Sequence, residues 1–463
     1  MNTSRRKFLT SSSALTASAV AGSLGTWGVE SASAAVGSGY RAMVCVFLFG
    51  GSDSNNMIIP FTDYGAYSAV RTTASNIGIP QANLVQFPAA GKTYGFHPSF
   101  GPAVSNLASL YTAGKMAVLA NAGTLIAPIA NKAQYQSTPS LRPPNLFSHS
   151  DQEDQWSGLI PTAPTRTGWG GRMSDKLLTV NAGGLIPAAV SVSGSQVFTN
   201  GITTAPLVIP QNGGVAVSGQ ATDAVSVARY NALVSLLNNA TPGNQVVQGA
   251  AGVMSKALTA NNTANPILTA TLPPAIQTAF TVNGTLLNTG IAQQLRQVAR
   301  LIDRSAETGV KRQLFFVSMG GYDTHSATVA TQTTLFNQLF TAMKAFYDYT
   351  AAAGISNDVV QFTMSDFNRT FIGNAAAGVD HAWGSHQIVV GGSVKGGSMY
   401  GTFPDLITNG TMDSGNNGAW IPGMAVDQIG ATLGKWFGMP GSDISQVFPN
   451  LGNFATPDLG FMA

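Results

Sequence analysis

Short runs of apolar residues recur along this chain, and several of them are followed by glycine-rich or polar turns. Runs of this length that end in turn residues are typical of buried β-strands. The pattern predicts five strands, at residues 42–49, 116–120, 313–319, 359–364 and 387–390.

Helical periods fall between these runs. One helix face is formed by Ile291, Leu295, Val298, Leu301 and Ile302, and a second by Leu335, Leu339, Met343 and Phe346. Alternating strands and helices predict an α/β fold, a three-layer sandwich whose mainly parallel central sheet is covered on both sides. Ligands of such sheets bind at the carboxyl ends of the strands, so candidate chemistry is sought there.

Residues 177–290 interrupt this pattern. Their only charged side chains are Asp223, Arg229 and Lys256, and Ala, Thr, Asn, Gly and Val dominate the rest. We interpret this stretch as an inserted cap that contains one helix, at about 221–238. Its Thr- and Asn-rich parts, 261–265 and 281–288, are expected to be exposed loops.

The amino terminus has the three regions of a secretory signal. Arg5 and Arg6 precede Lys7, a weakly apolar run follows, and an A-x-A cleavage site ends at Ala34. The paired arginines are typical of the twin-arginine route. The apolar run is too short and too rich in Ser, Thr and Gly for a permanent membrane anchor. We therefore expect a signal peptide at 1–34, a mature domain at 35–463, the translocation machinery as a partner, and a periplasmic or secreted location.

Composition narrows the function classes. Without the signal, 20 basic and 19 acidic side chains remain, a net charge of +1, so the main argument for nucleic-acid binding disappears. Cys45 is the only cysteine, so no intrachain disulfide can form and stability must come from core burial or bound ions. The twin-arginine route carries proteins that have already folded, often around a metal or cofactor. The expected export route therefore favours a bound metal.

Three segments place Asp and His residues just beyond predicted strands. The segment FFVSMGGYDTH carries Asp323 and His325, and the segment VCVFLFGGSDSNN carries Asp53. The third begins with VVQFTMSDFNRT, which carries Asp366, and continues with GVDHAWGSH, which carries Asp380, His381 and His386. Singly, each Asp is explained as a turn or capping residue and each His as a structural one. As a set at strand ends, they predict a shared polar or divalent-metal site.

Together these segments resemble a known family. Further matching segments are the block FHPSFGPAVSNLASLYTAGKMAVLANAG and the stretches SHSDQEDQW, GWGGR, DHAWGSHQIVVGGSVKGG and YGTFPDL. The chain is similar over nearly its whole mature length to the bacterial domain of unknown function 1501 family, a distant relative of the alkaline phosphatase and sulfatase superfamily. It departs at Asp366 and Asn368, where the family usually has Glu and Gly.

The resemblance implies an alkaline-phosphatase-like sheet with two divalent ions, of Zn, Mg, Ca or Mn. The residues that would correspond to the metal ligands are Asp53, Asp323, His325, Asp366, and His381 or His386. In the superfamily these ions activate a nucleophile at a helix start. Ser148 is our candidate nucleophile, because Ser148 precedes Gly158 by the interval found in the related enzymes. The alternative is that Ser148 is an ordinary helix cap.

The sequence leaves two hypotheses. The first is an exported metal-dependent hydrolase of phosphate-type esters, with Arg369 and His149 as candidate substrate-binding residues and a small anionic ester or polymer as substrate. A sulfatase ranks lower, because the signature of Cys or Ser followed by x-Pro-x-Arg is absent. The second is a non-catalytic secreted or envelope protein of the same fold that binds a glycan or a protein partner.

Overall fold

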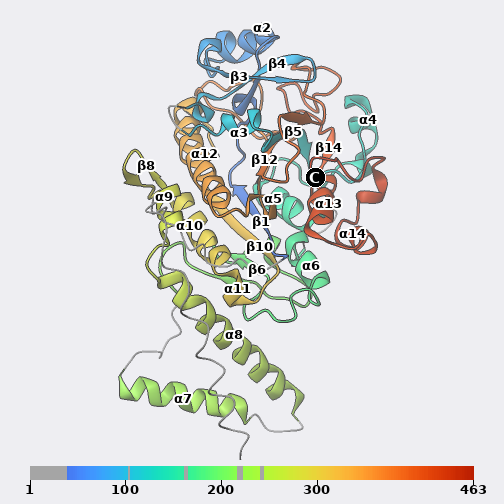
Figure 1. Ribbon diagram of the computed structural model, residues 1–463. Helices are drawn as coiled ribbons and strands as arrows, with labels where there is room; N and C mark the ends of the chain where they lie inside the picture. The colour runs from blue at the N-terminus through green and yellow to red at the C-terminus, as the bar shows by residue number, and fades with distance from the viewer. Residues whose placement is uncertain (1–38, 103–104, 161–164, 216–222, 240–243) are drawn as a thin grey trace, which may run out of the picture. The chain divides into compact units, whose positions relative to one another are not determined.

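The computed structural model describes residues 39–463 except 103–104, 161–164, 216–222 and 240–243 (Figure 1). The contacts of the chain separate Met1–Ala32 from Ser33–Ala463, and all described residues belong to the second unit. The predicted signal peptide, with Arg5, Arg6 and the cleavage site after Ala34, lies outside the described residues.

A mixed, mostly parallel sheet forms the centre of this unit. Its strand order is β13-β5-β12-β11-β1-β10-β6-β7, with β14 also paired to β5. The strands are β1 (Arg41–Leu48), β5 (Met116–Gly123), β6 (Ala189–Ser191), β7 (Leu207–Val208), β10 (Arg312–Met319), β11 (Val359–Ser365), β12 (Ser385–Gly391), β13 (Ser398–Tyr400) and β14 (Met424–Ala425). A smaller antiparallel sheet contains β2 (Ile58–Pro60), β3 (Val85–Ala89) and β4 (Lys92–Phe96), and β8 (Thr281–Val282) pairs with β9 (Thr285–Leu286).

All five predicted strands are confirmed, as β1, β5, β10, β11 and β12. Strand β1 lies between β10 and β11 and is parallel to both, so the carboxyl ends of these three strands meet at one edge. Strand β12 runs antiparallel to β11 and β5, which makes the sheet mixed.

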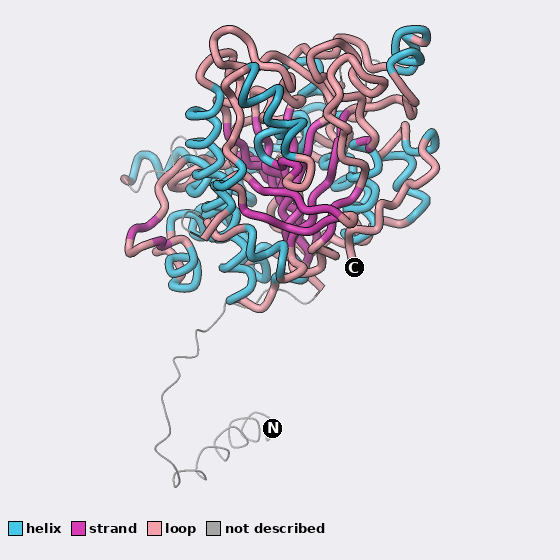
Figure 2. The backbone as a smooth tube through the Cα atoms, turned by 90° about the horizontal axis from the view of Figure 1, so that it is seen from above, coloured by secondary structure: helices cyan, strands magenta, loops and turns pink. Residues whose placement is uncertain are grey.

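Helices cover both faces of the sheet, and β1 shows why. Its even-numbered side chains, such as Val44 and Val46, belong to a core that includes Leu295 and Phe340 from one helix layer. Its odd-numbered side chains, such as Cys45, belong to a second core with helices of the other layer. Because successive strand residues point to opposite faces, a continuous apolar run is buried on both sides. Figure 2 shows the strands between these helices.

The two helices predicted from the faces at 291–302 and 335–346 are confirmed as α10 and α12. The helices are α1 (Ser54–Met57), α2 (Tyr64–Tyr67), α3 (Ala108–Thr112), α4 (Lys132–Ser137), α5 (His149–Gly158), α6 (Trp169–Lys176), α7 (Ala224–Asn238), α8 (Gln245–Thr269), α9 (Pro274–Ala279), α10 (Gly290–Asp303), α11 (Ser305–Thr308), α12 (Thr328–Ala352), α13 (Val426–Phe437) and α14 (Gly441–Val447). The longest of those described are α8 and α12, with 25 residues each. Among the described helices, none combines the length and the apolar character that a membrane crossing requires.

Residues 177–290 are only partly as expected. The predicted helix is present as α7, but the early part of the stretch adds β6 and β7 to the central sheet. The expected loop at 261–265 is wrong, because it lies inside α8, where Asn261 and Ala264 are buried. Residues 281–288 include the β8–β9 hairpin. The sequence did not indicate that 261–265 lies in α8, because runs of Asn and Thr are also typical of loops.

Asp427, in the first turn of α13, predicts a pH dependence of stability. Burial raises its pKa to about 7, whereas an unfolded Asp titrates at about 3.9. Its contribution to stability is therefore complete below pH ~4 and is lost as the pH rises through about 7. We expect Asp427→Asn, which keeps an acceptor oxygen for Asn450, to lose less stability than wild type between pH 5 and pH 8. Urea unfolding of both proteins at both pH values measures this, and equal losses would contradict it.

Candidate metal centre

The carboxyl ends of β1, β10 and β11 bring together loops that are far apart in the sequence. Gly50 follows β1, Asp323 follows β10 and Asp366 follows β11 directly. The Gly50 N–H donates to Asp366 Oδ2 at 3.0 Å, which ties the first loop to the third. The loops that follow these strands therefore meet at one edge of the sheet, where the strand-end rule places candidate ligand sites.

Gly50 allows this close approach. Its φ of +104° lies in a region that L side chains rarely adopt, and a Cβ built there would lie 2.5 Å from the backbone nitrogen of Asp323. Only a residue without a side chain lets the β1 and β10 loops pass at this distance. The glycine pair after β1 is thus a requirement of the site.

Four potential ligand atoms converge at this edge. Around Asp323 Oδ1 lie the Nε2 atoms of His149 at 3.6 Å, His325 at 3.0 Å and His381 at 3.6 Å. The Nε2 atoms of His325 and His381 are 3.1 Å apart. His149, Asp323 and His381 form a group whose ligand atoms all lie within 4.8 Å of one another.

These separations fit a divalent ion. Zinc binds imidazole nitrogen and carboxylate oxygen at about 2.0–2.1 Å in tetrahedral sites, which places neighbouring ligand atoms about 3.3–3.4 Å apart. The four distances given above, 3.0–3.6 Å, bracket that value. His325 lies close to Asp323 and His381 but is not a member of the group whose ligand atoms all lie within 4.8 Å of one another. Three imidazoles and one carboxylate are also a donor set that suits zinc and similar transition metals better than Mg²⁺ or Ca²⁺, which prefer oxygen.

The outer nitrogen of each imidazole has its own acceptor. His149 Nδ1 lies 2.7 Å from Asp366 Oδ2, His325 Nδ1 lies 2.9 Å from Asp380 Oδ1, and His381 Nδ1 lies 2.7 Å from the Phe147 carbonyl oxygen. Metal-binding histidines almost always donate this N–H to a carboxylate or carbonyl, which turns Nε2 toward the ion. All three rings are therefore held in the orientation that ligation needs.

Charge and burial favour the ligating forms of Asp323 and His381, whereas the carboxylate beside His149 favours its protonated form. Partial burial opposes ionisation of Asp323, but the hydrogen bond and charge of Arg369 outweigh it, so the pKa of Asp323 is lowered. Burial lowers the pKa of His381, which favours the neutral ring. The hydrogen bond to Asp366 raises the pKa of His149. Asp323 remains 48% exposed, so one side of the cluster is open to solvent.

Glu153 is a member of the site that sequence reasoning missed. With His149 and Asp366 it forms a second group of ligand atoms within 4.8 Å of one another. Burial, followed by the charge of Asp366, raises the pKa of Glu153 to about 7. A signal was available, because His149 and Glu153 are four residues apart and share one face of α5.

Two predicted ligands have other partners. Asp53 is buried and paired with Arg71, and burial raises its pKa. His386 is also buried, where its Nδ1 accepts from the Asn121 N–H and its ring stacks on Phe403. Neither belongs to the metal-compatible groups found among the described residues. Asp366 contacts the His149 ring and, with His149 and Glu153, belongs to the second metal-compatible group.

The candidate catalytic and substrate residues also occupy defined places. Ser148 is the residue before α5, but its Oγ donates to Asp151 Oδ2 at 2.6 Å and makes no capping bond. Arg369 is fully buried, and its three nitrogens donate to Gly51, Val379, Gly50 and Asp323. Arg369 therefore holds the Asp323 carboxylate, and His149 lies among the ligand atoms. These contacts differ from the substrate-binding roles that the sequence suggested.

The departure at Asn368 has a local explanation. Asn368 Oδ1 accepts from the backbone N–H of Ser54 at 3.0 Å and from Ser54 Oγ at 2.9 Å. A glycine would supply neither bond. Asn368 therefore links the loop after β11 to α1, close to the Asp366 that orients His149.

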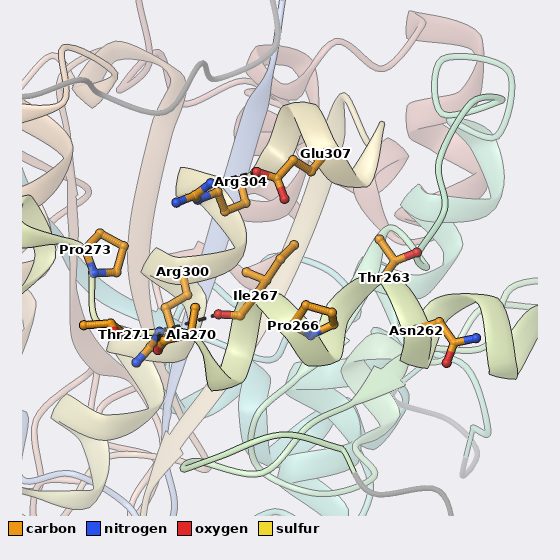
Figure 3. A pocket seen from close by; sticks show the side chains of 10 residues that line it. All are labelled: Asn262, Thr263, Pro266, Ile267, Ala270, Thr271, Pro273, Arg300, Arg304 and Glu307. Carbon is orange, nitrogen blue, oxygen red and sulfur yellow. Dashed lines mark hydrogen bonds and ion pairs between the residues drawn. The ribbon is translucent and has the colours of Figure 1, made fainter. Parts of the chain in front are cut away.

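A separate cavity of about 360 Å³ lies where α8 meets α10 and α11 (Figure 3). Arg300 and Arg304 line it, but Arg300 donates to the Ala270 carbonyl at 2.7 Å and Arg304 pairs with Glu307. Both guanidinium groups therefore already have partners, and the partner of Arg300 is the carbonyl of the residue that follows α8. None of the residues of the metal cluster lines this cavity.

Comparison with protein families agrees with the resemblance. A family model described as a protein of unknown function (DUF1501) matches residues 40–415. The chain belongs to the DUF1501 family. The matched range contains the whole cluster from His149 to His381, so the metal-compatible site lies within the family's own region. No curated protein matches this DUF1501 chain.

Several solved structures are distantly similar to this DUF1501 protein. Ps i-CgsB in complex with k-i-k-neocarrahexaose has 10% identity, covers 87% of this chain and 72% of its own, and gives a TM-score of 0.33. Ps i-CgsB alone has 9% identity with coverage of 90% and 77% and a TM-score of 0.35. The PsFucS1 sulfatase from Pseudoalteromonas sp. has 9% identity with coverage of 86% and 68% and a TM-score of 0.30.

Proposed function

We propose that this protein is an exported metal-dependent hydrolase of phosphate-type esters, with sulfate esters as a second possibility. The observation that carries the proposal is the set of three histidines whose Nε2 atoms surround Asp323 Oδ1 while each Nδ1 has an acceptor. A divalent ion held by these residues would supply Lewis-acid chemistry toward an ester oxygen that enters as a fifth ligand. A transition metal such as zinc is the ion that this donor set favours.

The residues around the ligands have distinct tasks in this proposal. Asp366 fixes the ring of His149, and Arg369 fixes the carboxylate of Asp323. Glu153, whose pKa is raised to about 7, is suited to hold or release a proton near neutral pH. The solvent-exposed side of Asp323 and His325 gives an anionic ester a route to the cluster.

The proposal is tested with the mature protein, by elemental analysis and by a screen of p-nitrophenyl phosphate, phosphodiester and sulfate substrates. We expect a bound transition metal and turnover of a phosphate-type ester, both absent in Asp323→Ala. Asp405→Ala, at an exposed aspartate outside the cluster, is the matched control. Absence of both metal and turnover in wild type would refute the proposal. Metal without turnover would instead favour the non-catalytic binding protein.

Ser148 is retained as the candidate nucleophile, supported by its place immediately before His149 at the start of α5. We expect Ser148→Ala to keep the metal and the fold but to reduce kcat by several orders of magnitude, because the substitution removes the hydroxyl that attacks the ester. Kinetics with the best ester substrate and a metal assay measure this. If kcat is unchanged, Ser148 only supports Asp151, the carboxylate to which its hydroxyl donates.

A further inference from the structure

Helix α7 and the amino-terminal half of α8, residues 245–257, form a helical hairpin. The carboxyl-terminal half of α8 joins the main core through Ala260, Ala264 and Ile267. The amino-terminal half has no buried residue, and α7, which packs along α8, has none either. The hairpin is thus anchored at one end of α8 and presents the rest of both helices to solvent (Figure 1).

The exposed surface of this hairpin carries several large apolar side chains among polar ones. On α7, Val225 is 59% and Leu236 is 73% exposed, and on α8, Val246 is 81% and Val253 is 72% exposed. Large apolar side chains that gather on an exposed surface mark an interaction site. Something is therefore expected to cover both helices.

The pattern on α8 points to a second helix as the cover. Val246, Gly249, Ala250 and Val253 are spaced i, i+3, i+4 and i+7, so they share one face. A Cβ added at Gly249 would meet nothing within 4 Å, so no contact inside this chain requires glycine there. Glycine in a helix interior costs about 1 kcal/mol relative to alanine. A shallow site between two exposed valines suits the close approach of another helix.

We propose that this hairpin is a dimerisation element, in which two copies of the chain pack hairpin against hairpin into a four-helix bundle. A two-fold interface must be self-complementary, and this face supplies both the protruding valines and the small residues that receive them. Two helices about 20 Å long and about 10 Å wide present a face of about 400 Å² before corrugation, roughly half of the ~800 Å² per partner of a standard interface, so the proposed dimer interface is a small one.

Charge argues against other occupants. Within the two described helical segments, Arg229 and Lys256 are the only charged side chains. An acidic or basic protein partner would therefore find little complementary charge. Binding to an anionic membrane surface would gain only about 1 kcal/mol from each of these two cations. A neutral, apolar partner of the same shape is the best match, and a second copy provides it.

Sedimentation velocity of the mature protein, with light scattering, tests the proposal. We expect a dimer at micromolar concentration. The double variant Val246→Arg/Val253→Arg should weaken association on the order of tenfold or more. The matched control is Ile202→Arg, which changes an isoleucine that is 75% exposed and lies outside the hairpin. This control should remain dimeric.

Gly249→Leu distinguishes a shape-complementary dimer from non-specific hydrophobic association. Leucine raises helix propensity and adds apolar surface, so non-specific association would strengthen. In the proposed dimer it fills the site that receives the partner, and association should weaken. Thermal melts confirm that each variant is folded. A monomeric wild type, a dimer that none of these changes weakens, or hairpin-dependent binding to phosphatidylglycerol vesicles by a monomer would overturn the proposal.

Discussion

His381→Ala is expected to abolish stoichiometric metal binding by the mature protein. The variant removes one of three Nε2 donors and leaves Asp323 Oδ1 with His149 and His325. Loss of an outer hydrogen-bond partner typically lowers metal affinity by roughly 10- to 100-fold, and loss of a ligand should cost more. Elemental analysis after dialysis, and titration against a chromophoric chelator, measure the effect.

Two further variants provide an intermediate loss of metal affinity and a control without loss. Asp366→Asn keeps all four ligands but weakens the orientation of His149, so we expect an intermediate loss of roughly 10- to 100-fold. His97→Ala changes a buried histidine that contacts Ser99, Thr333 and Phe336 instead of the cluster, and it should keep the metal. Equal metal content in His381→Ala and His97→Ala would contradict the ligand set.

Gly50→Ala is expected to have the largest effect on stability of all these substitutions. The added Cβ would meet the Asp323 nitrogen at 2.5 Å and the Tyr322 carbonyl carbon at 3.1 Å, and both are backbone atoms that cannot move alone. Backbone strain costs about 1–3 kcal/mol and overpacking about 1–3 kcal/mol. We therefore expect the free energy of unfolding to fall by roughly 2–6 kcal/mol, together with loss of metal binding.

The control for Gly50→Ala is Gly91→Ala. Gly91 also has a positive φ, +75°, but a Cβ there meets nothing within 4 Å. The control isolates the backbone cost, about 1–2 kcal/mol, from the clash with the Asp323 loop. Denaturant unfolding of both variants compares them. If both variants lose the same free energy of unfolding, the close contact between the β1 and β10 loops does not contribute to the stability of the site.

The central fold could be predicted because its strands are buried on both faces. A run such as 42–49 is apolar throughout, so its length and its closing glycines were enough to predict β1. The 261–265 segment was mistaken for a loop because Asn and Thr occupy a helix whose burial depends on α10, a tertiary contact that local pattern does not encode.

Part of the site could also be predicted, because some of its residues follow strands that the sequence reveals. Asp323 and His325 lie in the loop that follows a recognisable strand, β10, so the topology placed them at the edge of the sheet. His149 comes from α5, and nothing in the local sequence indicates that this helix start lies against the β10 loop. Asp53 also follows a strand, as Asp323 does, but Arg71, from the helical segment Ser68–Ala74, pairs with its carboxylate. Pairing between distant side chains therefore decided which strand-end residues form the cluster.

The most direct test of the metal centre is X-ray absorption at the metal edge, on the mature protein loaded with zinc. The three-histidine cluster predicts a first shell of three imidazole nitrogens and one carboxylate oxygen at about 2.0–2.1 Å. His381→Ala should lose one imidazole from that shell or lose the zinc. A shell of oxygen ligands without imidazole, or a spectrum unchanged in His381→Ala, would contradict the proposed centre.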